Sequence, residues 1–122
     1  MTPQDLLKQY ESLINLHQFD AVAPLIAVDA VFWFNDGSFA GTDAIRGAFE
    51  RTWAGLASEI YWLTDIRWIA LGDVAASCIY QFNWKASMDG QDASGSGRGT
   101  TVLHKSADGW RIVHEHLSGM PG

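Results

Sequence analysis

The sequence predicts an α+β fold in which helices come first and antiparallel strands follow. Apolar residues recur at helical spacing in the first half of the chain, whereas β-branched and aromatic runs dominate from residue 60 onward. Short turn sequences separate these later runs, as in consecutive antiparallel hairpins. The length of 122 residues suits one domain, residues 1–122. Because long strands twist and coil, we expect the sheet to curl around the helices.

The first helix begins at Thr2-Pro3-Gln4-Asp5. Thr2 is a suitable N-cap, and proline suits the first helical position. One face of this helix carries Leu6, Tyr10, Leu13, Ile14 and His17. A shorter helix is predicted from Phe19 to Ala27, in which Pro24 indicates a first-turn position or a break.

A buried strand and a second long helix are expected next. Ala30–Phe34 is β-branched and aromatic, and Asn35–Ser38 predicts the turn that ends it. The second long helix opens with Thr42 as its cap and stops at Gly55. Its core face is predicted to carry Ile45, Phe49 and Trp53, which lie four residues apart.

Four strands are expected in the second half. Their predicted ranges are Ile60–Leu71, Val74–Ala86, Arg98–Lys105 and Trp110–Ser118. The predicted connections are a two-residue hairpin loop at Gly72-Asp73, a polar loop at Met88–Gly95 and a turn at Ala107–Gly109.

Composition limits the classes of partner. The chain carries 8 Lys and Arg residues against 14 Asp and Glu residues, a formal charge of -6. Such a surface repels phosphate backbones and anionic lipids, so we expect no nucleic-acid and no membrane partner. The single Cys78 excludes an intrachain disulfide and favours a reducing compartment. The N-terminus lacks the apolar run of a signal peptide, and we expect a cytoplasmic protein.

Strand alternation predicts which side chains face a common pocket, since alternate residues share a face. One face of the second predicted strand of this half carries Cys78, Tyr80, Phe82 and Trp84. On the last strand, one face carries Trp110, Ile112, His114, His116 and Ser118, against Arg111, Val113, Glu115 and Leu117. The first of these faces grades from apolar to imidazole, a pattern typical of a small-molecule site.

The sharpest chemical feature is the sequence His114-Glu115-His116. Two imidazoles on one strand face suit a general acid/base pair or a hydrogen-bonding wall. Two other interpretations are a purely structural pair and a metal site. A metal would need a third ligand from Asp36, His104 or His17. We expect no metal and no cofactor.

Four further residues have a functional and a structural interpretation. Tyr10 aims its hydroxyl into a cavity or packs in the core. Asp36, just past a strand, is a general base or a turn cap. Arg98, among glycines, holds a carboxylate or is a solvated edge residue. Cys78 among aromatic residues is an inert filler rather than a nucleophile.

The segments AVFWFNDGSFAGTDAIRGAF and TTVLHKSADGWRIVHEHLS resemble the SnoaL-like, or nuclear-transport-factor-2-like, superfamily, and the resemblance covers nearly the whole chain. The G-x-x-A-I-R helix start at Gly41–Arg46 and the D-G-W-R-I-V-H-E-H-L-S ending are similar to its ketosteroid-isomerase-like and kinase-association-domain-like branches. The resemblance implies a cone-shaped curved antiparallel sheet wrapped over three helices, a hydrophobic pocket and a homodimer formed through the outer sheet face. The superfamily includes isomerases, hydrolases, dehydratases, cyclases and non-catalytic binding domains, so fold does not decide function.

Ketosteroid isomerase offers a specific comparison, because its chemistry needs an Asp base, a Tyr and a protonated Asp. Tyr10 matches the catalytic Tyr of that family. Phe34 takes the position of the Asp base, and Thr101 takes the position of the second Asp. Because neither residue is an acid, the resemblance predicts no steroid isomerisation by that mechanism. Asp36, two residues after Phe34, is conceivable as a displaced base. The same matching puts His114 and His116 on the pocket face.

These observations lead to two functional hypotheses. The first is a pocket for a small apolar ligand with a polar head, with acid/base chemistry of an isomerase, dehydratase or hydrolase type. Its expected catalytic residues are His114, His116, Tyr10 and Asp36, and its expected lining residues are Phe34, Trp53, Cys78, Tyr80, Phe82, Thr101 and Ile112. The alternative is a non-catalytic dimerisation or protein-binding module. For either, Ile79, Val113 and Leu117 predict an apolar centre for a homodimer interface that Val113→Glu weakens.

Overall fold

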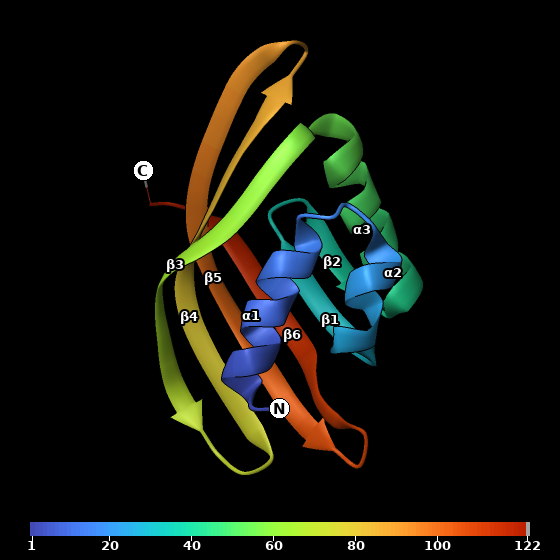
Figure 1. Cartoon of the computed structure of the whole chain (residues 1–122), viewed down its shortest axis with the longest axis vertical. Helices are drawn as coiled ribbons and strands as arrows, with labels where there is room; N and C mark the ends of the chain where they lie inside the picture. The colour runs from blue at the N-terminus through green and yellow to red at the C-terminus, as the bar shows by residue number, and fades with distance from the viewer. Residues whose placement is uncertain (122) are drawn as a thin grey trace.

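The computed structural model describes residues 1–121, and its elements follow the predicted order (Figure 1). The helical elements are α1 (Pro3–Ile14), α2 (Phe19–Val22), the short 3-10 helix η1 (Ala23–Leu25) and α3 (Thr42–Gly55). The strands are β1 (Ile26–Phe34), β2 (Gly37–Ala40), β3 (Ala57–Leu71), β4 (Ala75–Met88), β5 (Gln91–Ser106) and β6 (Gly109–Gly119). The structure confirms the predicted α+β fold.

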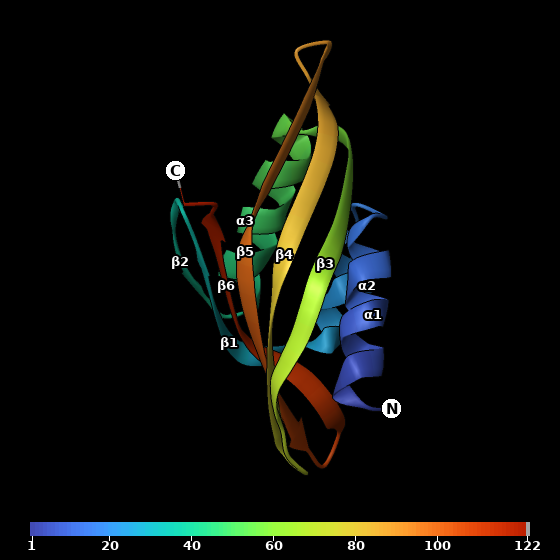
Figure 2. The same cartoon turned by 90° about the vertical axis from the view of Figure 1, so that its left-hand side faces the viewer.

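The strands form one curved sheet of six strands in the order β2-β1-β6-β5-β4-β3. Neighbouring strands are antiparallel except β1 and β6, which are parallel. The sheet does not close, and α1 and α2 cover one of its sides (Figures 1 and 2). We call this covered side the inner face and the opposite side the outer face.

The two long helices follow the local rules of capping and periodicity. The Thr2 side chain accepts a hydrogen bond from the Asp5 N–H, and the Asp5 carboxylate accepts one from the Thr2 N–H, which completes a capping box. Helix α3 is capped by Gly41 rather than Thr42, because the cap residue has φ +85°, a conformation that favours glycine. As predicted, α3 ends at Gly55 and turns Ile45, Phe49 and Trp53 toward the core.

Three predicted segments differ in the structure: the second helix, the turn after β1 and the loop between β4 and β5. The second predicted helix gives way to η1 and ends at Leu25, so that β1 starts earlier than expected. A short strand, β2, pairs with β1 where only a turn was predicted. Most of the expected polar loop at residues 88–95 is strand, because Asp89 (φ +51°) and Gly90 (φ +79°) form a tight two-residue turn between β4 and β5.

The hairpin between β3 and β4 is also slightly longer than predicted. Its loop contains three residues, Gly72–Val74, rather than two. The Gly72 N–H donates to the Ala75 carbonyl oxygen and closes the loop, with an N···O distance of 2.9 Å.

A β-bulge in β6 decides which side chains of that strand face inward. Leu103 of β5 pairs with Ile112, but the next β5 pair joins Val102 to His114, so Val113 is one extra residue. Ile112 and Glu115, three positions apart, are therefore both buried. Strict alternation would have placed them on opposite faces.

Glycines on β5 make room for the aromatic side chains of β4. Gly97 pairs with Phe82 and Gly99 pairs with Tyr80. A Cβ atom at either glycine would overlap the paired aromatic ring. Both rings can therefore lie flat against β5 on the inner face, where Cys78, Tyr80, Phe82 and Trp84 point as predicted.

Within residues 1–121, none of the helices has both the length and the apolar character needed to cross a membrane.

Candidate functional site

A cavity of about 280 Å³ opens between the helices and the inner face of the sheet. Its apolar and aromatic wall consists of Ile14, Phe34, Phe49, Trp53, Leu56, Tyr61, Phe82, Trp84 and Leu117. Its polar residues are Asn35, Asp36, Thr52, Glu59 and Glu115. An apolar wall with a few polar groups is the usual construction of a small-molecule site.

The carboxyl group of Glu115 is held by three hydroxyl groups and is almost fully buried, with 1% of the residue exposed. The Tyr10 hydroxyl donates to Oε2 at 3.3 Å. The Tyr80 and Thr101 hydroxyls lie 3.4 and 3.5 Å from Oε1 and 2.8 Å from each other. Helix α1 and strands β4, β5 and β6 thus each contribute one side chain to this polar cluster.

The protonation of Glu115 reflects this environment. Burial raises the pKa of Glu115 to about 7, while the hydrogen bonds from Tyr10, Tyr80 and Thr101 act in the opposite direction. Burial, followed by the charge of Glu115, raises the pKa of Tyr10 and of Tyr80 well above the ordinary tyrosine value. Both phenols therefore remain neutral hydrogen-bond donors at physiological pH, beside a carboxyl group that gains and loses a proton there.

A second carboxyl group, that of Glu59 on β3, also lines the cavity. The residue is 7% exposed, and burial raises its pKa to about 7. The His17 Nε2–H donates to the Glu59 backbone carbonyl at 2.9 Å, and the His17 ring stacks on Trp53. These contacts fix the backbone at Glu59, at the point where β3 begins.

The structure does not place His114 and His116 in the cavity. Both imidazoles lie against Trp33 on the outer face, with ring centroids 4.9 and 5.6 Å from the indole. The His114 Nδ1–H also donates to the Val31 carbonyl at 2.6 Å. The bulge at Val113 is the reason, because it turns the residue between the histidines inward and the histidines outward.

The chain matches the model of the SnoaL-like domain over residues 4–122. It belongs to the SnoaL-like family. No curated protein matches the sequence.

Solved structures confirm the fold of this SnoaL-like domain. A nuclear transport factor 2-like superfamily protein from Salmonella enterica has a TM-score of 0.88 and 22% identity, covering 97% of this chain and 88% of its own. A Novosphingobium aromaticivorans protein provisionally named an aromatic ring hydroxylase has a TM-score of 0.86 and 21% identity, covering 98% and 87%. A Xanthomonas campestris protein provisionally named a calcium/calmodulin-dependent protein kinase II association domain has a TM-score of 0.83 and 21% identity, covering 95% and 84%. At these identities the likeness concerns the fold alone.

The other predicted site residues of the SnoaL-like domain fall into three groups. Phe34, Asp36, Trp53 and Phe82 line the cavity, and Asp36 is exposed. Tyr10, Tyr80 and Thr101 surround the Glu115 carboxyl group and lie outside the cavity lining, in which Tyr80 and Thr101 were expected. Cys78 and Ile112 were expected in the lining, but both are fully buried in the core outside it.

The surroundings of Cys78 and Arg98 favour the structural interpretation of each residue. Burial raises the pKa of the Cys78 thiol to about 12, which suits an inert filler rather than a nucleophile. Arg98 is exposed on β5, which is an interior strand of the sheet rather than an edge. Within residues 1–121, no group of three or more His, Cys, Asp or Glu side chains is arranged to hold a metal ion.

Sequence reasoning missed the two glutamate residues of the cavity, Glu115 and Glu59. Glu115 was assigned to the outer face by strict alternation, although its neighbour on that face, Leu117, is apolar. The apolar Leu117 beside Glu115 could have indicated a β-bulge, because a bulge before Glu115 turns both residues inward. No comparable local signal marked Glu59, which lies just before the range predicted as strand.

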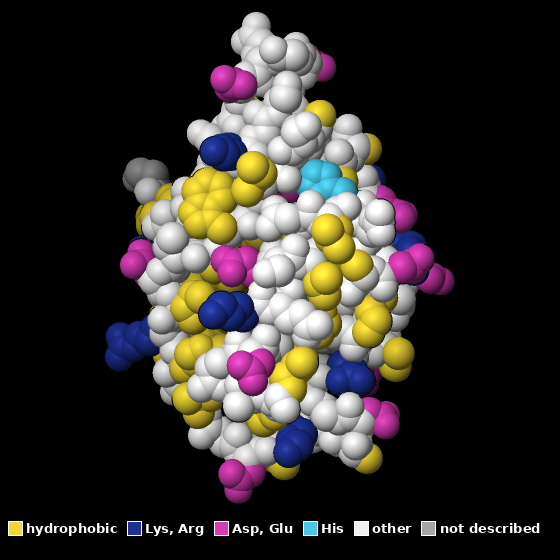
Figure 3. All heavy atoms as spheres, viewed as in Figure 1, with side chains coloured by type: hydrophobic (Ala, Val, Ile, Leu, Met, Phe, Trp, Pro, Cys, Tyr) yellow, Lys and Arg dark blue, Asp and Glu magenta, His cyan; other side chains and the backbone are white. Residues whose placement is uncertain are grey.

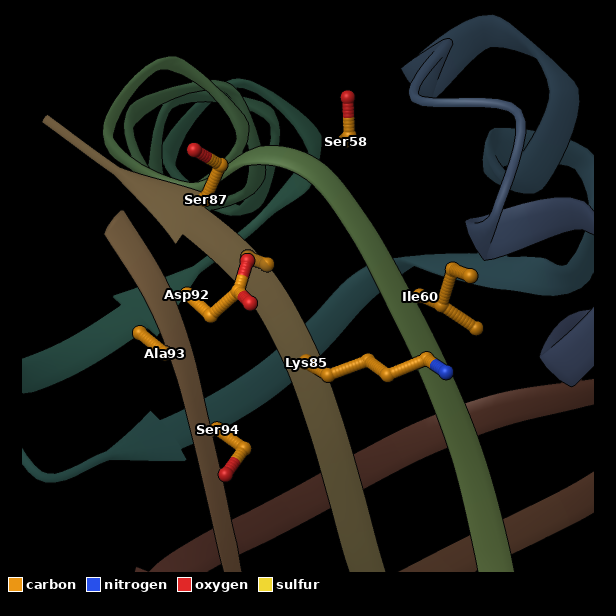
Figure 4. A pocket seen from close by; sticks show the side chains of 8 residues that line it. Ser58, Ile60, Lys85, Ser87, Asp92, Ala93 and Ser94 are labelled. Atoms are coloured by element: carbon orange, nitrogen blue, oxygen red, sulfur yellow. The ribbon is translucent and has the colours of Figure 1, made fainter. Parts of the chain in front are cut away.

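A larger hollow of about 560 Å³ lies where β3 begins, β4 ends and β5 begins (Figure 4). It is lined by Ser58, Ile60, Lys85, Ala86, Ser87, Asp92, Ala93 and Ser94. These side chains are exposed or half-buried, and the two charged ones, Lys85 and Asp92, are exposed. The smaller cavity is the better candidate site, because it combines an apolar wall with buried titratable groups.

Proposed function

We propose that this SnoaL-like domain binds a small, largely apolar molecule and transfers protons on it through the carboxyl group of Glu115. The observation that carries the proposal is the position of this carboxyl group, buried on the wall of an aromatic cavity. A carboxyl group with a pKa of about 7 supplies both the acid and the base form at neutral pH. Such a group suits isomerisation or dehydration, in which a proton leaves one atom and another atom is protonated.

The surrounding hydroxyl groups support this role. Tyr10, which matches the catalytic Tyr of ketosteroid isomerase, bonds directly to the Glu115 carboxyl group. Thr101, which matches the second Asp of that enzyme, is the cross-strand partner of Glu115. A carboxyl group thus adjoins the tyrosine in this chain too, but it comes from the neighbouring strand.

Proton exchange on a bound carbonyl compound tests the proposal. Cyclic enones and cyclic ketones are screened by thermal shift, and exchange of their α-protons in D₂O is followed by NMR. Glu115→Gln is expected to slow exchange by about 10²–10⁴-fold, the usual contribution of a general acid/base. Binding, measured by tryptophan fluorescence, is expected to persist in this variant.

His116→Ala is the matched control. His116 lies on the same strand but is exposed on the outer face, so its removal is expected to leave exchange and binding unchanged. Equal exchange rates in wild type and Glu115→Gln, or loss of exchange in His116→Ala, would contradict the assignment.

A second candidate role, self-association, is favoured by apolar side chains on the outer face. Ile60, Trp62 and Ile79 are 48%, 37% and 39% exposed. In the view of Figure 3, hydrophobic atoms gather along the left edge, where β3 lies. Leu117 was expected to belong to this surface, but it lines the cavity instead. The apolar centre of the proposed homodimer interface therefore shifts to β3 and β4.

Light scattering at micromolar concentration is expected to give a homodimer mass, twice the 13.4 kDa of one chain. Trp62→Glu is expected to shift the protein toward the monomer, because it places a charge in the apolar centre of the interface. Glu50→Gln, an exposed change on α3, serves as the control and is expected to remain dimeric. A monomeric wild-type protein would rule out this assembly.

A further inference from the structure

Glu59 is a largely buried residue whose carboxyl group has no hydrogen-bond or ion-pair partner among residues 1–121. Only 7% of the residue is exposed, and it lines the cavity. Within residues 1–121, the hydrogen bond between Glu59 and the His17 side chain uses the Glu59 backbone carbonyl, and the Glu59 carboxyl oxygens take part in no hydrogen bond or ion pair. Glu115, by contrast, receives three hydroxyl groups. The unbonded carboxyl oxygens of Glu59 are not sealed in the core, so a ligand bound in the cavity that this residue lines can pair with them.

The charges around the cavity share one sign. Asp36, Glu59 and Glu115 line it, and none of the described lining residues is Lys, Arg or His. The whole chain carries a formal charge of -6. An anionic ligand would meet only like charges here, whereas a cation would be attracted both at long range and inside the cavity.

The aromatic wall is also suited to a cation. Tyr61, two residues after Glu59 on β3, lines the same cavity as Phe82 and Trp84. The Tyr61 and Phe82 rings stack with centroids 6.1 Å apart. Aromatic faces attract ammonium groups and also bury apolar carbon atoms, so one wall can serve both parts of an amine.

From the unpaired carboxyl group, the charge of the lining and the aromatic wall, we infer that the ligand of this cavity is a small organic cation, a protonated amine with an apolar or aromatic body. The ammonium group pairs with Glu59, and the apolar body lies against Phe82 and Trp84. This inference rests on the proposed small-molecule function and specifies its substrate class. It assigns Glu59 to ligand binding and leaves Glu115 as the proton-transfer group.

Proton binding by Glu59 offers an independent readout. Burial raises the pKa of this carboxyl group to about 7, and a bound ammonium group would favour its charged form. The other titratable groups around it are Glu115 and Tyr61 on the cavity wall, Asp36 at its exposed part, and His17 on the adjacent backbone. Binding of a cation should therefore release protons and strengthen as pH rises from 5 to 8.

Three probes of similar size and different charge test the inference: benzylamine, benzyl alcohol and benzoate. Calorimetric titration at pH 7.5 is expected to show benzylamine binding at least about tenfold more tightly than benzyl alcohol, because it forms a charge-assisted hydrogen bond. Benzoate is expected to bind weakest. Titration in buffers of different ionisation enthalpy should reveal proton release with benzylamine alone.

Glu59→Gln keeps the side-chain shape and removes the charge. It is expected to abolish the preference for benzylamine, its pH dependence and its proton release, while benzyl alcohol still binds. Glu50→Gln removes the same charge from the exposed face of α3 and should leave the preference intact. Thermal melting of both variants checks that they fold.

The outcomes separate this inference from the proposed function. Benzyl alcohol binding as tightly as benzylamine, or Glu59→Gln weakening both probes equally, would overturn the cationic ligand and leave the pocket in place. Failure of all three probes to bind would overturn the inference as well. The Glu115 exchange experiment, which uses neutral carbonyl compounds, decides the proposed function separately.

Discussion

Replacing Phe49 by alanine is expected to lower the free energy of unfolding by about 3–5 kcal/mol, the usual cost of removing a buried phenylalanine ring. Phe49 lies on the inner side of α3 and is 8% exposed. Its ring lies 5.5–6.3 Å, centroid to centroid, from those of Phe19, Phe32, Phe34 and Trp53. The alanine variant loses these contacts and leaves a space that α3 and β1 cannot fill without moving.

Urea unfolding followed by circular dichroism and tryptophan fluorescence measures the change. Glu50→Ala, one residue further along α3 and exposed, is the matched control and is expected to change stability by less than about 0.5 kcal/mol. If Phe49→Ala unfolded at the urea concentration of the wild type, the packing of α3 on the sheet would be wrong.

The second large effect is expected in the pH dependence of stability. Folding raises the pKa of Glu115 from 4.5 to about 7, so the folded protein holds this proton more tightly than the unfolded chain does. The resulting stabilisation is complete below pH 4.5 and is lost as pH rises to about 7. By linkage, the loss from this one residue is about 3 kcal/mol.

Glu115→Gln cannot ionise at this position, so its stability is expected to fall less steeply across this pH range than that of the wild type. Glu59 has a pKa raised in the same direction, also to about 7, and Glu59→Gln should remove a second part of the slope. Urea unfolding at half-unit steps from pH 4 to 8 measures both contributions. An identical pH profile for wild type and Glu115→Gln would show that the carboxyl group is not held in the environment described above.

Local sequence signals were sufficient for the two long helices and for the side-chain alternation of β4. The capping box at Thr2 and Asp5, the four-residue spacing of the α3 core residues and the alternation around Tyr80 and Phe82 all depend on residues close together in the chain. Such patterns act through backbone hydrogen bonds and side-chain direction within one element. They therefore predicted the α+β class and the shared face of Cys78, Tyr80, Phe82 and Trp84 on β4.

The sequence by itself therefore determined the fold class, the long helices and the shared face of β4, whereas tertiary pairing decided the chemistry of the cavity. The direction of Glu115 depends on the bulge at Val113, which exists only in the register of β6 against β5. That one extra residue exchanged the predicted histidines for a carboxyl group, because a shift by one position moves every following side chain to the other face. The environment of Glu59 likewise arises only when α1, α3 and the sheet enclose it, since burial is a property of the assembled layers rather than of any segment.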